Sequence, residues 1–273
     1  MAKGRNNLRR RRGRGRFGPL LKLLCALAVV AALTFGATVF FKVEQVTVSG
    51  NSRYTQEEVV TASGIQTGDN LYRLNKYQIK DEILRTLPYV EGVNIVRDLP
   101  STIVITVYEW DAVARIQAPK AGEIPGGESE GEPLAVATED WLISVGGKLL
   151  EPAPADSTAI LVTGITPVLP RAGTMLALPQ AEEAKNRALL DLLGQLEELD
   201  MMSRVTAIHL DATQVLLRYE DCFDVKLPLT ADFNYKLRAL EAVVQDTRQK
   251  LGEEIGGTFD MTQEGYTAMY SPG

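Results

Sequence analysis

The sequence predicts an α+β protein carried on a single N-terminal transmembrane helix. Three observations support this fold class. An apolar run without charges covers residues 23–41, residues 43–116 follow a β-α-α-β-β pattern, and residues 134–271 alternate strand and helix patterns. The last segment fits a second α+β domain with a mostly antiparallel sheet. The chain has 273 residues, which leaves enough after the apolar run for two domains with cores of their own.

The apolar run from Leu23 to Phe41 has 19 residues and lies between Lys22 and Lys42. As a helix it would reach about 28 Å, close to the roughly 30 Å hydrocarbon core of a bilayer. Backbone amides inside a bilayer need partners within their own segment, so a spanning helix is expected. A cleaved signal peptide and a buried core helix are the alternatives. The run is long for the first and too apolar on all sides for the second.

Charge predicts the orientation of this helix. Residues 1–22 carry nine Lys or Arg and no Asp or Glu, which places this basic tail in the cytoplasm by the positive-inside rule. Beyond Lys42, 19 basic residues stand against all 35 acidic residues, so the C-terminal part is acidic and is expected outside the cell. The tail could also bind nucleic acid, but a charge run beside a membrane helix more often contacts lipid headgroups. We therefore expect a lipid bilayer and no nucleic acid among its partners.

The first module begins directly after the membrane. Thr55 and Glu58 form a capping-box pattern that opens one helix, Gly64 suits its end, and Asn75 can cap a second helix that Pro88 ends. Alternating apolar residues predict strands at 43–49, 90–97 and 102–109. The order is β-α-α-β-β.

Residues 117–133 are rich in Pro, Gly and Glu and are expected to form a flexible acidic linker, or a surface loop of one continuous domain. After them, two long amphipathic patterns predict helices at 180–200 and 230–250. Strand patterns lie at 141–145, 148–151, 205–210, 215–219, 223–227, 258–261 and 266–270. Residues 161–169 are expected to hold a short strand and a Gly/Pro-rich turn.

No pattern of catalytic or metal-binding residues is present in the sequence. The only histidine, His209, has no second His or Cys at ligand spacing, and Cys222 lies beside acids that disfavour a reactive thiolate. Cys25 falls inside the apolar run, so no disulfide with Cys222 is expected. Phosphate-binding and nucleophile-elbow motifs are also missing from the sequence. We expect no enzyme activity, no metal, no cofactor and no small-molecule substrate.

Several segments of the N-terminal part resemble a known family. They are V-x-x-V-x-V-x-G-N at 43–51, G-D-N-L at 68–71, P-Y-V at 88–90 and V-R-x-L-P-S-T-I-x-I-x-V-x-E at 96–109. With the basic tail and single span, they are similar to the FtsQ/DivIB bacterial cell-division proteins. The resemblance implies a POTRA domain at 43–116 and an FtsQ/DivIB-type β domain at 134–271.

The resemblance also implies a function. It indicates a single-pass membrane scaffold at the division septum, which binds FtsL and FtsB/DivIC-type partners outside the cell and helps regulate septal peptidoglycan synthesis. The alternative is a membrane-anchored envelope enzyme or ligand-binding module whose site no motif reveals. Co-purification with coiled-coil membrane partners would favour the first function, and turnover of a cell-wall substrate would favour the second.

The last predicted strand is the expected partner-binding site. Only three residues follow it, so its outer edge would stay unpaired unless an earlier strand is placed there, and an unpaired edge can accept a strand from another protein. The strand consists of Tyr266, Thr267, Ala268, Met269 and Tyr270. The family resemblance assigns partner binding to this strand and, on the preceding helix, to Phe233 and Lys236. The alternative is that Tyr266 and Tyr270 pack on the core of their own domain.

Overall fold

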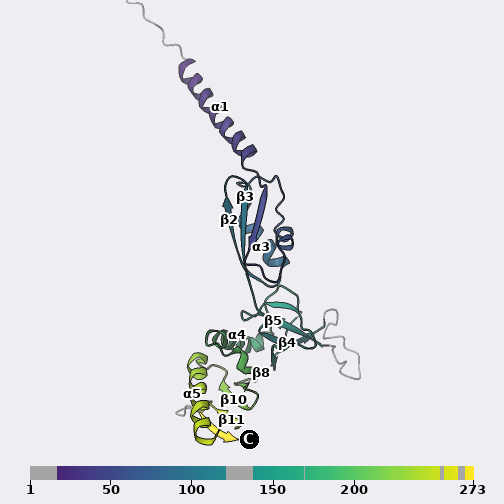
Figure 1. The fold of residues 1–273 in the computed structure, drawn as a ribbon, viewed down its shortest axis with the longest axis vertical. Coiled ribbons are helices and arrows are strands. Elements are labelled where there is room, and N and C mark those ends of the chain that lie inside the picture. Colours follow the sequence, from purple (N-terminus) through teal and green to yellow (C-terminus); the bar gives the residue numbers. More distant parts are fainter. Residues whose placement is uncertain (1–16, 121–137, 169, 253–254, 264–267) are drawn as a thin grey trace, which may run out of the picture.

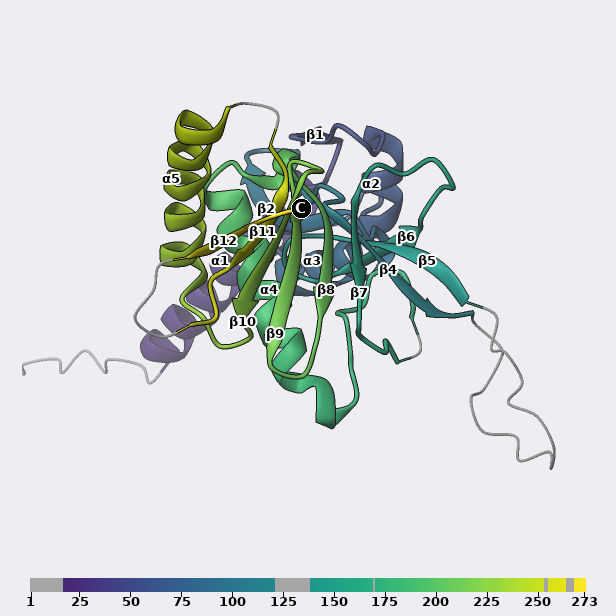
Figure 2. The ribbon, with the colours of Figure 1, turned by 90° about the horizontal axis from the view of Figure 1, so that it is seen from below.

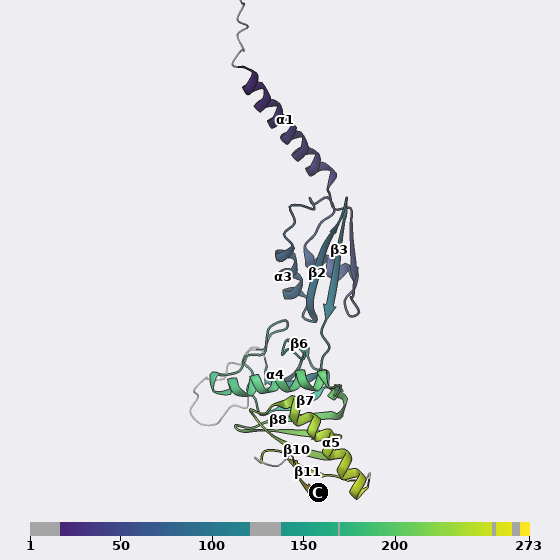
Figure 3. The ribbon, with the colours of Figure 1, turned by 90° about the vertical axis from the view of Figure 1, so that its left-hand side faces the viewer.

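The structure is a computed structural model in which an apolar helix, a three-stranded unit and a nine-stranded unit follow one another (Figure 1). It describes residues 17–120, 138–168, 170–252, 255–263 and 268–273. The C-terminus lies at the end of the molecule farthest from the apolar helix (Figures 1 and 3).

Helix α1 (Phe17–Phe40) covers the predicted span except its last residue, Phe41, and begins six residues before Leu23. Its window from Gly18 to Gly36 is long and apolar enough to cross a membrane. The large apolar side chains described along it are exposed, and none of the other described residues covers them. Such an exposed apolar surface is favourable in the hydrocarbon core of a bilayer.

The predicted β-α-α-β-β order of the first unit is confirmed. Its elements are β1 (Gln45–Ser49), α2 (Gln56–Ser63), α3 (Lys76–Thr86), β2 (Val90–Asp98) and β3 (Thr102–Glu109). The sheet has the order β1-β3-β2, with β1 parallel and β2 antiparallel to β3. Both parts of the Thr55–Glu58 capping box are formed, and Asn75 accepts the amide of Tyr77. Val59 and Ile83, from the two helices, are fully buried in the core.

The second unit is a mostly antiparallel sheet with two long helices. Its strands are β4 (Ala114–Pro119), β5 (Thr138–Ile143), β6 (Leu149–Pro152), β7 (Ile160–Thr163), β8 (Val205–Leu210), β9 (Gln214–Tyr219), β10 (Phe223–Pro228), β11 (Gly257–Asp260) and β12 (Met269–Pro272). The sheet order is β12-β11-β10-β9-β8-β7-β4-β5-β6. Helices α4 (Glu183–Glu198) and α5 (Phe233–Leu251) pack against it in one apolar core (Figures 2 and 3). Short 3-10 helices, Gln180–Glu182 and Met202–Arg204, precede α4 and β8.

Strand β4 departs from the boundaries expected from the sequence. Residues 114–116 were expected to close the first domain and residue 117 to begin a loop, whereas 114–119 form a strand between β5 and β7 of the second sheet. The strand forms because Ala114, Ile116 and Ala118 alternate along it and their side chains are buried. The sequence does not predict it because two of these three residues are small alanines. The two sheets therefore divide between Glu109 and Ala114. Residues 121–137, most of the predicted linker, lie outside the described residues.

The two units share a buried junction. Tyr89 of the first unit packs with Leu142 and Leu150 of the second, and all three side chains are buried. Lys148 extends from the second unit into the first, where its Nζ donates to the carbonyl oxygen of Val90 at 2.9 Å and to that of Leu84 at 3.4 Å. The lysine is 8% exposed, and this burial lowers its pKa.

A polar rim closes the junction on one side. The Arg53 guanidinium lies 2.6 Å from Glu151 Oε1 and 3.7 Å from the centre of the Tyr89 ring. The Tyr89 hydroxyl donates to the same Glu151 oxygen at 2.7 Å. Burial, together with this bond, raises the pKa of Tyr89. Burial acts to raise the pKa of the Glu109 carboxyl, but hydrogen bonds from the Ser52 hydroxyl and from the backbone amides of Arg53 and Ser52 hold that pKa below its usual value. Arg53 and Tyr89 thus bond across the junction to Glu151, and Glu109 holds the loop that carries Arg53.

Candidate functional site

Strand β12 is the outermost strand of the nine-stranded sheet. It pairs antiparallel with β11, which pairs parallel with β10. Among the described residues, no strand pairs with the other side of β12. The predicted unpaired edge is therefore present, but the strand spans Met269–Pro272 rather than Tyr266–Tyr270. Tyr266 and Thr267 lie outside the described residues.

The pairing register shows which backbone groups of β12 are open. The Gly273 amide donates to the Gly256 carbonyl at 3.2 Å, and Gly257 lies opposite Pro272. This combination makes Gly257 and Pro272 a non-hydrogen-bonded pair, because antiparallel pairs alternate between bonded and non-bonded. Met269 and Ser271 therefore bond to β11, whereas Tyr270 directs its N–H and C=O outward.

Ala268 lies one residue before β12, and the same alternation extended by that residue places its backbone outward. Pro272 is also at an outward position, so its missing N–H costs no bond to β11. We call the backbone groups of Ala268, Tyr270 and Pro272 the outer edge. It offers two amide donors and three carbonyl acceptors to an added strand.

The side chains of β12 divide between core and solvent. The Tyr270 ring lies 5.1 Å from the Phe259 ring, and its hydroxyl donates to the Gly256 carbonyl at 2.9 Å. Tyr270 thus packs on its own domain, as the alternative interpretation expected for it, and Ala268 also packs against the core. Met269 is 49% exposed on the other face. The side chain available beside the outer edge is therefore Met269 rather than Tyr270.

The two α5 residues assigned by the resemblance lie in different environments. Phe233 is 2% exposed and belongs to the core, so it presents no surface to a partner. Lys236 donates its Nζ to the carbonyl of Met261 at 2.8 Å, which fastens α5 to the chain that leaves β11. Asp260 accepts the Thr262 hydroxyl and amide there, and these bonds lower the pKa of Asp260. Phe233 is therefore excluded from the predicted binding surface, and Lys236 bonds the segment that follows β11.

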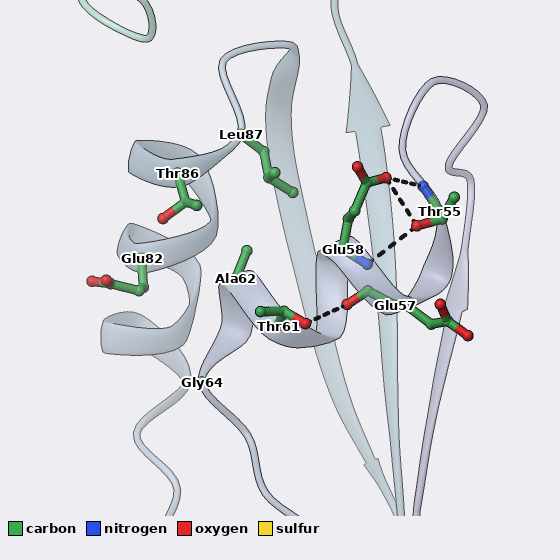
Figure 4. Close-up of a pocket in the computed structure, with 9 residues that line it drawn as sticks. All are labelled: Thr55, Glu57, Glu58, Thr61, Ala62, Gly64, Glu82, Thr86 and Leu87. Carbon is green, nitrogen blue, oxygen red and sulfur yellow. Dashed lines mark hydrogen bonds between the residues drawn. The ribbon is translucent and has the colours of Figure 1, made fainter.

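A pocket of about 730 Å³ lies between α2 and α3 (Figure 4). Glu57, Glu58 and Glu82 line it, with Ala62 and Leu87 as its apolar part. Glu58 already bonds Thr55, which lowers the pKa of Glu58, and Glu82 pairs with Arg85 at 2.5 Å. Two of its three carboxylates are therefore engaged within the unit.

The predicted strand residue His209 lies on the exposed side of β8. Its Nδ1 is 2.8 Å from the Thr163 hydroxyl, and its Nε2 is 3.2 Å from Asp211 Oδ1. Thr163 is its register partner on β7, so the contact is a cross-strand pair. In the described part of the chain, no group of three or more His, Cys, Asp or Glu is placed to hold a metal ion.

Comparison with known proteins identifies the first unit. Residues 41–110 match the family model described as POTRA domain, FtsQ-type. The cell division protein DivIB of Clostridium acetobutylicum is 33% identical over 79 residues, 29% of this chain and 31% of the relative. FtsQ of Corynebacterium glutamicum is 27% identical over 123 residues, which are 44% of this chain and 54% of the relative. DivIB of Lactococcus lactis strain KF147 is 32% identical over 98 residues, which are 33% of this chain and 25% of the relative.

These matches confirm the resemblance to FtsQ and DivIB. They cover between 25% and 54% of the length of the three relatives. Residues 41–110 are thus an FtsQ-type POTRA domain.

Proposed function

We propose that this chain, a relative of the FtsQ and DivIB cell-division proteins, is a single-pass membrane scaffold of the division machinery. The POTRA match and the relatives' names support a role in division. In this proposal the protein binds FtsL and FtsB/DivIC-type partners outside the cell and helps regulate septal peptidoglycan synthesis at the septum. It acts by holding partners in place.

The proposed topology places residues 1–22 in the cytoplasm and residues 43–273 outside. The nine basic residues before the span support this orientation. In a Cys25→Ala and Cys222→Ala background, a cysteine introduced by Ser129→Cys should react with a membrane-impermeant reagent on intact cells, whereas one introduced by Asn6→Cys should react only after lysis. The opposite pattern would reverse the topology.

The outer edge of β12 is the observation that carries the proposed partner binding. An extended segment of a partner would receive backbone hydrogen bonds from Ala268 and Tyr270, as in strand addition at other sheet edges. The edge lies at the end of the molecule farthest from α1 (Figure 3). A partner anchored in the same membrane would need a segment that extends past the POTRA unit to reach it.

Replacement of one outward amide tests this binding mode. Ala268→Pro removes an outward donor and obstructs a docking strand, whereas the matched variant Ala268→Val keeps the amide. The full-length variants would be co-expressed with tagged FtsB/DivIC-type and FtsL-type proteins, and capture from detergent-solubilised membranes would be compared. We expect Ala268→Pro to lose capture and Ala268→Val to retain it. Equal capture by two equally folded variants would exclude strand addition here.

A further inference from the structure

The membrane-facing end of the POTRA unit is joined closely to the end of α1. The Leu71 amide donates to the Phe41 carbonyl at 3.0 Å, and the Val43 amide donates to the Asp69 carbonyl at 2.8 Å. Lys42 and Asn70 form an isolated antiparallel bridge. These bonds attach residues 68–71 to the segment that leaves the helix. The POTRA unit therefore begins directly where α1 ends, within a few residues of the proposed span.

Aromatic rings continue from the helix onto the POTRA unit. The rings of Phe40 and Phe41 lie 5.2 Å apart, and those of Phe41 and Tyr72 lie 5.1 Å apart, both edge to face. Phe40 is 67% exposed and Tyr72 is 55% exposed. Tyrosine and other amphipathic aromatic residues are favoured at the depth of lipid headgroups.

The loop that carries Tyr72 is held in one shape. Arg97 from β2 donates to the carbonyl of Leu71 at 2.6 Å and to that of Leu74 at 2.8 Å. Leu71 is fully buried, and the Tyr72 amide is bonded to Asn70 Oδ1 at 3.0 Å. The exposed ring of Tyr72 is thus presented by a fixed backbone, which reduces the entropy lost on binding a surface.

A second apolar residue lies at the same end. Leu99, in the turn between β2 and β3, is 52% exposed, and this turn is bonded to the start of β1 through the Glu44 amide and the Ser101 carbonyl at 2.8 Å. Exposed Lys42 and Arg73 accompany these residues, and exposed Glu44 and Asp98 balance their charge. The mixture of apolar tips and balanced charge fits a phospholipid headgroup layer without a requirement for anionic lipid.

We infer that Tyr72 and Leu99 form a membrane-contact surface that docks the POTRA unit onto the outer leaflet at the end of α1. The occupant is the phospholipid headgroup layer, because the surface is continuous with the proposed membrane span. Docking would restrict the tilt of the ectodomain and help hold the β12 edge at a set height above the membrane. The inference rests on the membrane span of the proposed function and does not depend on partner capture.

A fluorescent label at Leu99 tests the contact in the full chain. Leu99→Cys, in a Cys25→Ala and Cys222→Ala background, would carry an environment-sensitive dye in phosphatidylcholine nanodiscs that contain a headgroup-region nitroxide lipid. We expect blue-shifted, quenched emission. The matched label at Tyr108→Cys, which is exposed on the far part of β3, should be neither shifted nor quenched. Water-like, unquenched emission from the Leu99 label would overturn the inference.

A second comparison isolates the contribution of Tyr72. Tyr72→Ser should lower the ratio of docked to undocked label about tenfold, the change expected from loss of one partly buried ring. Tyr77→Ser, at a more exposed tyrosine on α3, should leave the ratio unchanged. Equal ratios for the two variants would overturn the role of Tyr72. Because these discs hold no partner protein, failure here is distinct from failure of partner capture.

Discussion

The junction between the two units and the outer edge of β12 differ in whether their backbone polar groups are hydrogen-bonded. At the junction, Lys148 crosses from the second unit to bond the carbonyls of Leu84 and Val90. At the outer edge, the amide and carbonyl of Tyr270 point away from the sheet, and no described residue pairs with them. Buried polar groups need hydrogen-bond partners within the protein, whereas backbone groups at an exposed strand edge can bond to another protein. The junction therefore contributes to stability, and the edge is where we propose that a partner binds.

The largest effect on stability is expected at the apolar part of the junction. Leu150 is 1% exposed, and Leu150→Ala should lower the free energy of unfolding by about 2–5 kcal/mol through the cavity it leaves. Urea denaturation of the full chain in detergent measures the change. Leu99→Ala is the control, because Leu99 is 52% exposed and should change stability by no more than about 0.5 kcal/mol. Equal losses in the two variants would mean that the junction is not a packed interface.

Lys148 should give the junction a dependence on pH. Burial lowers the pKa of Lys148 below its ordinary 10.5, so between the two values the unfolded chain binds more protons than the folded chain. The free energy of unfolding contributed by this residue then rises with pH by about 1.4 kcal/mol across each pH unit of that window. Urea denaturation of wild type and Lys148→Met at increasing alkaline pH measures the difference. Parallel pH profiles would contradict the burial of a charged amine.

A smaller effect is expected at the polar rim. Tyr89→Phe removes the hydrogen bond to Glu151 and should cost about 0.5–1.5 kcal/mol. Tyr89→Phe, Glu151→Gln and the double variant form a thermodynamic cycle that isolates this contact. Strict additivity of the two single changes would show that the hydroxyl and the carboxylate do not interact in solution.

The smallest effect on stability is expected at the outer edge. Met269→Lys alters an exposed side chain and should change the free energy of unfolding by at most about 0.5 kcal/mol. A lysine beside an open edge should nevertheless abolish partner capture, because charged side chains discourage strand addition. Met269→Leu should retain capture. Capture by Met269→Lys equal to that of wild type would separate this face from partner binding.

Local patterns in the sequence were sufficient to predict the POTRA unit. The Thr55–Glu58 box, the Asn75 cap and strong alternation in β3 each act within a few residues of one another, and all are formed. Strand β4 was missed because Ala114 and Ala118 are buried by their neighbours β5 and β7 rather than by their own size. An apolar pattern in the sequence does not show that a small residue is buried by neighbouring strands of the folded sheet.

The edge was predicted only in part. Pro272 is one of the three residues after the predicted strand, but it belongs to β12, where at an outward position its missing amide costs no ladder bond. Phe233 lies within the amphipathic pattern at 230–250, and the resemblance assigned it to partner binding. In the structure it is buried with Leu237 and Leu240 on the core side of α5. The junction could not be predicted, because Lys148 and its acceptor Val90 are 58 positions apart with no local signal.

Residue-resolved amide exchange at β12 tests the central claim most directly. In the free full-length protein, the amides of Met269 and Ser271 should exchange slowly because they bond to β11, whereas the Tyr270 amide should exchange quickly. With an FtsB/DivIC-type partner bound, the Tyr270 amide should become as protected as its neighbours. A Tyr270 amide that is already protected in the free protein, or that exchanges equally fast in the complex, would contradict strand addition at this edge.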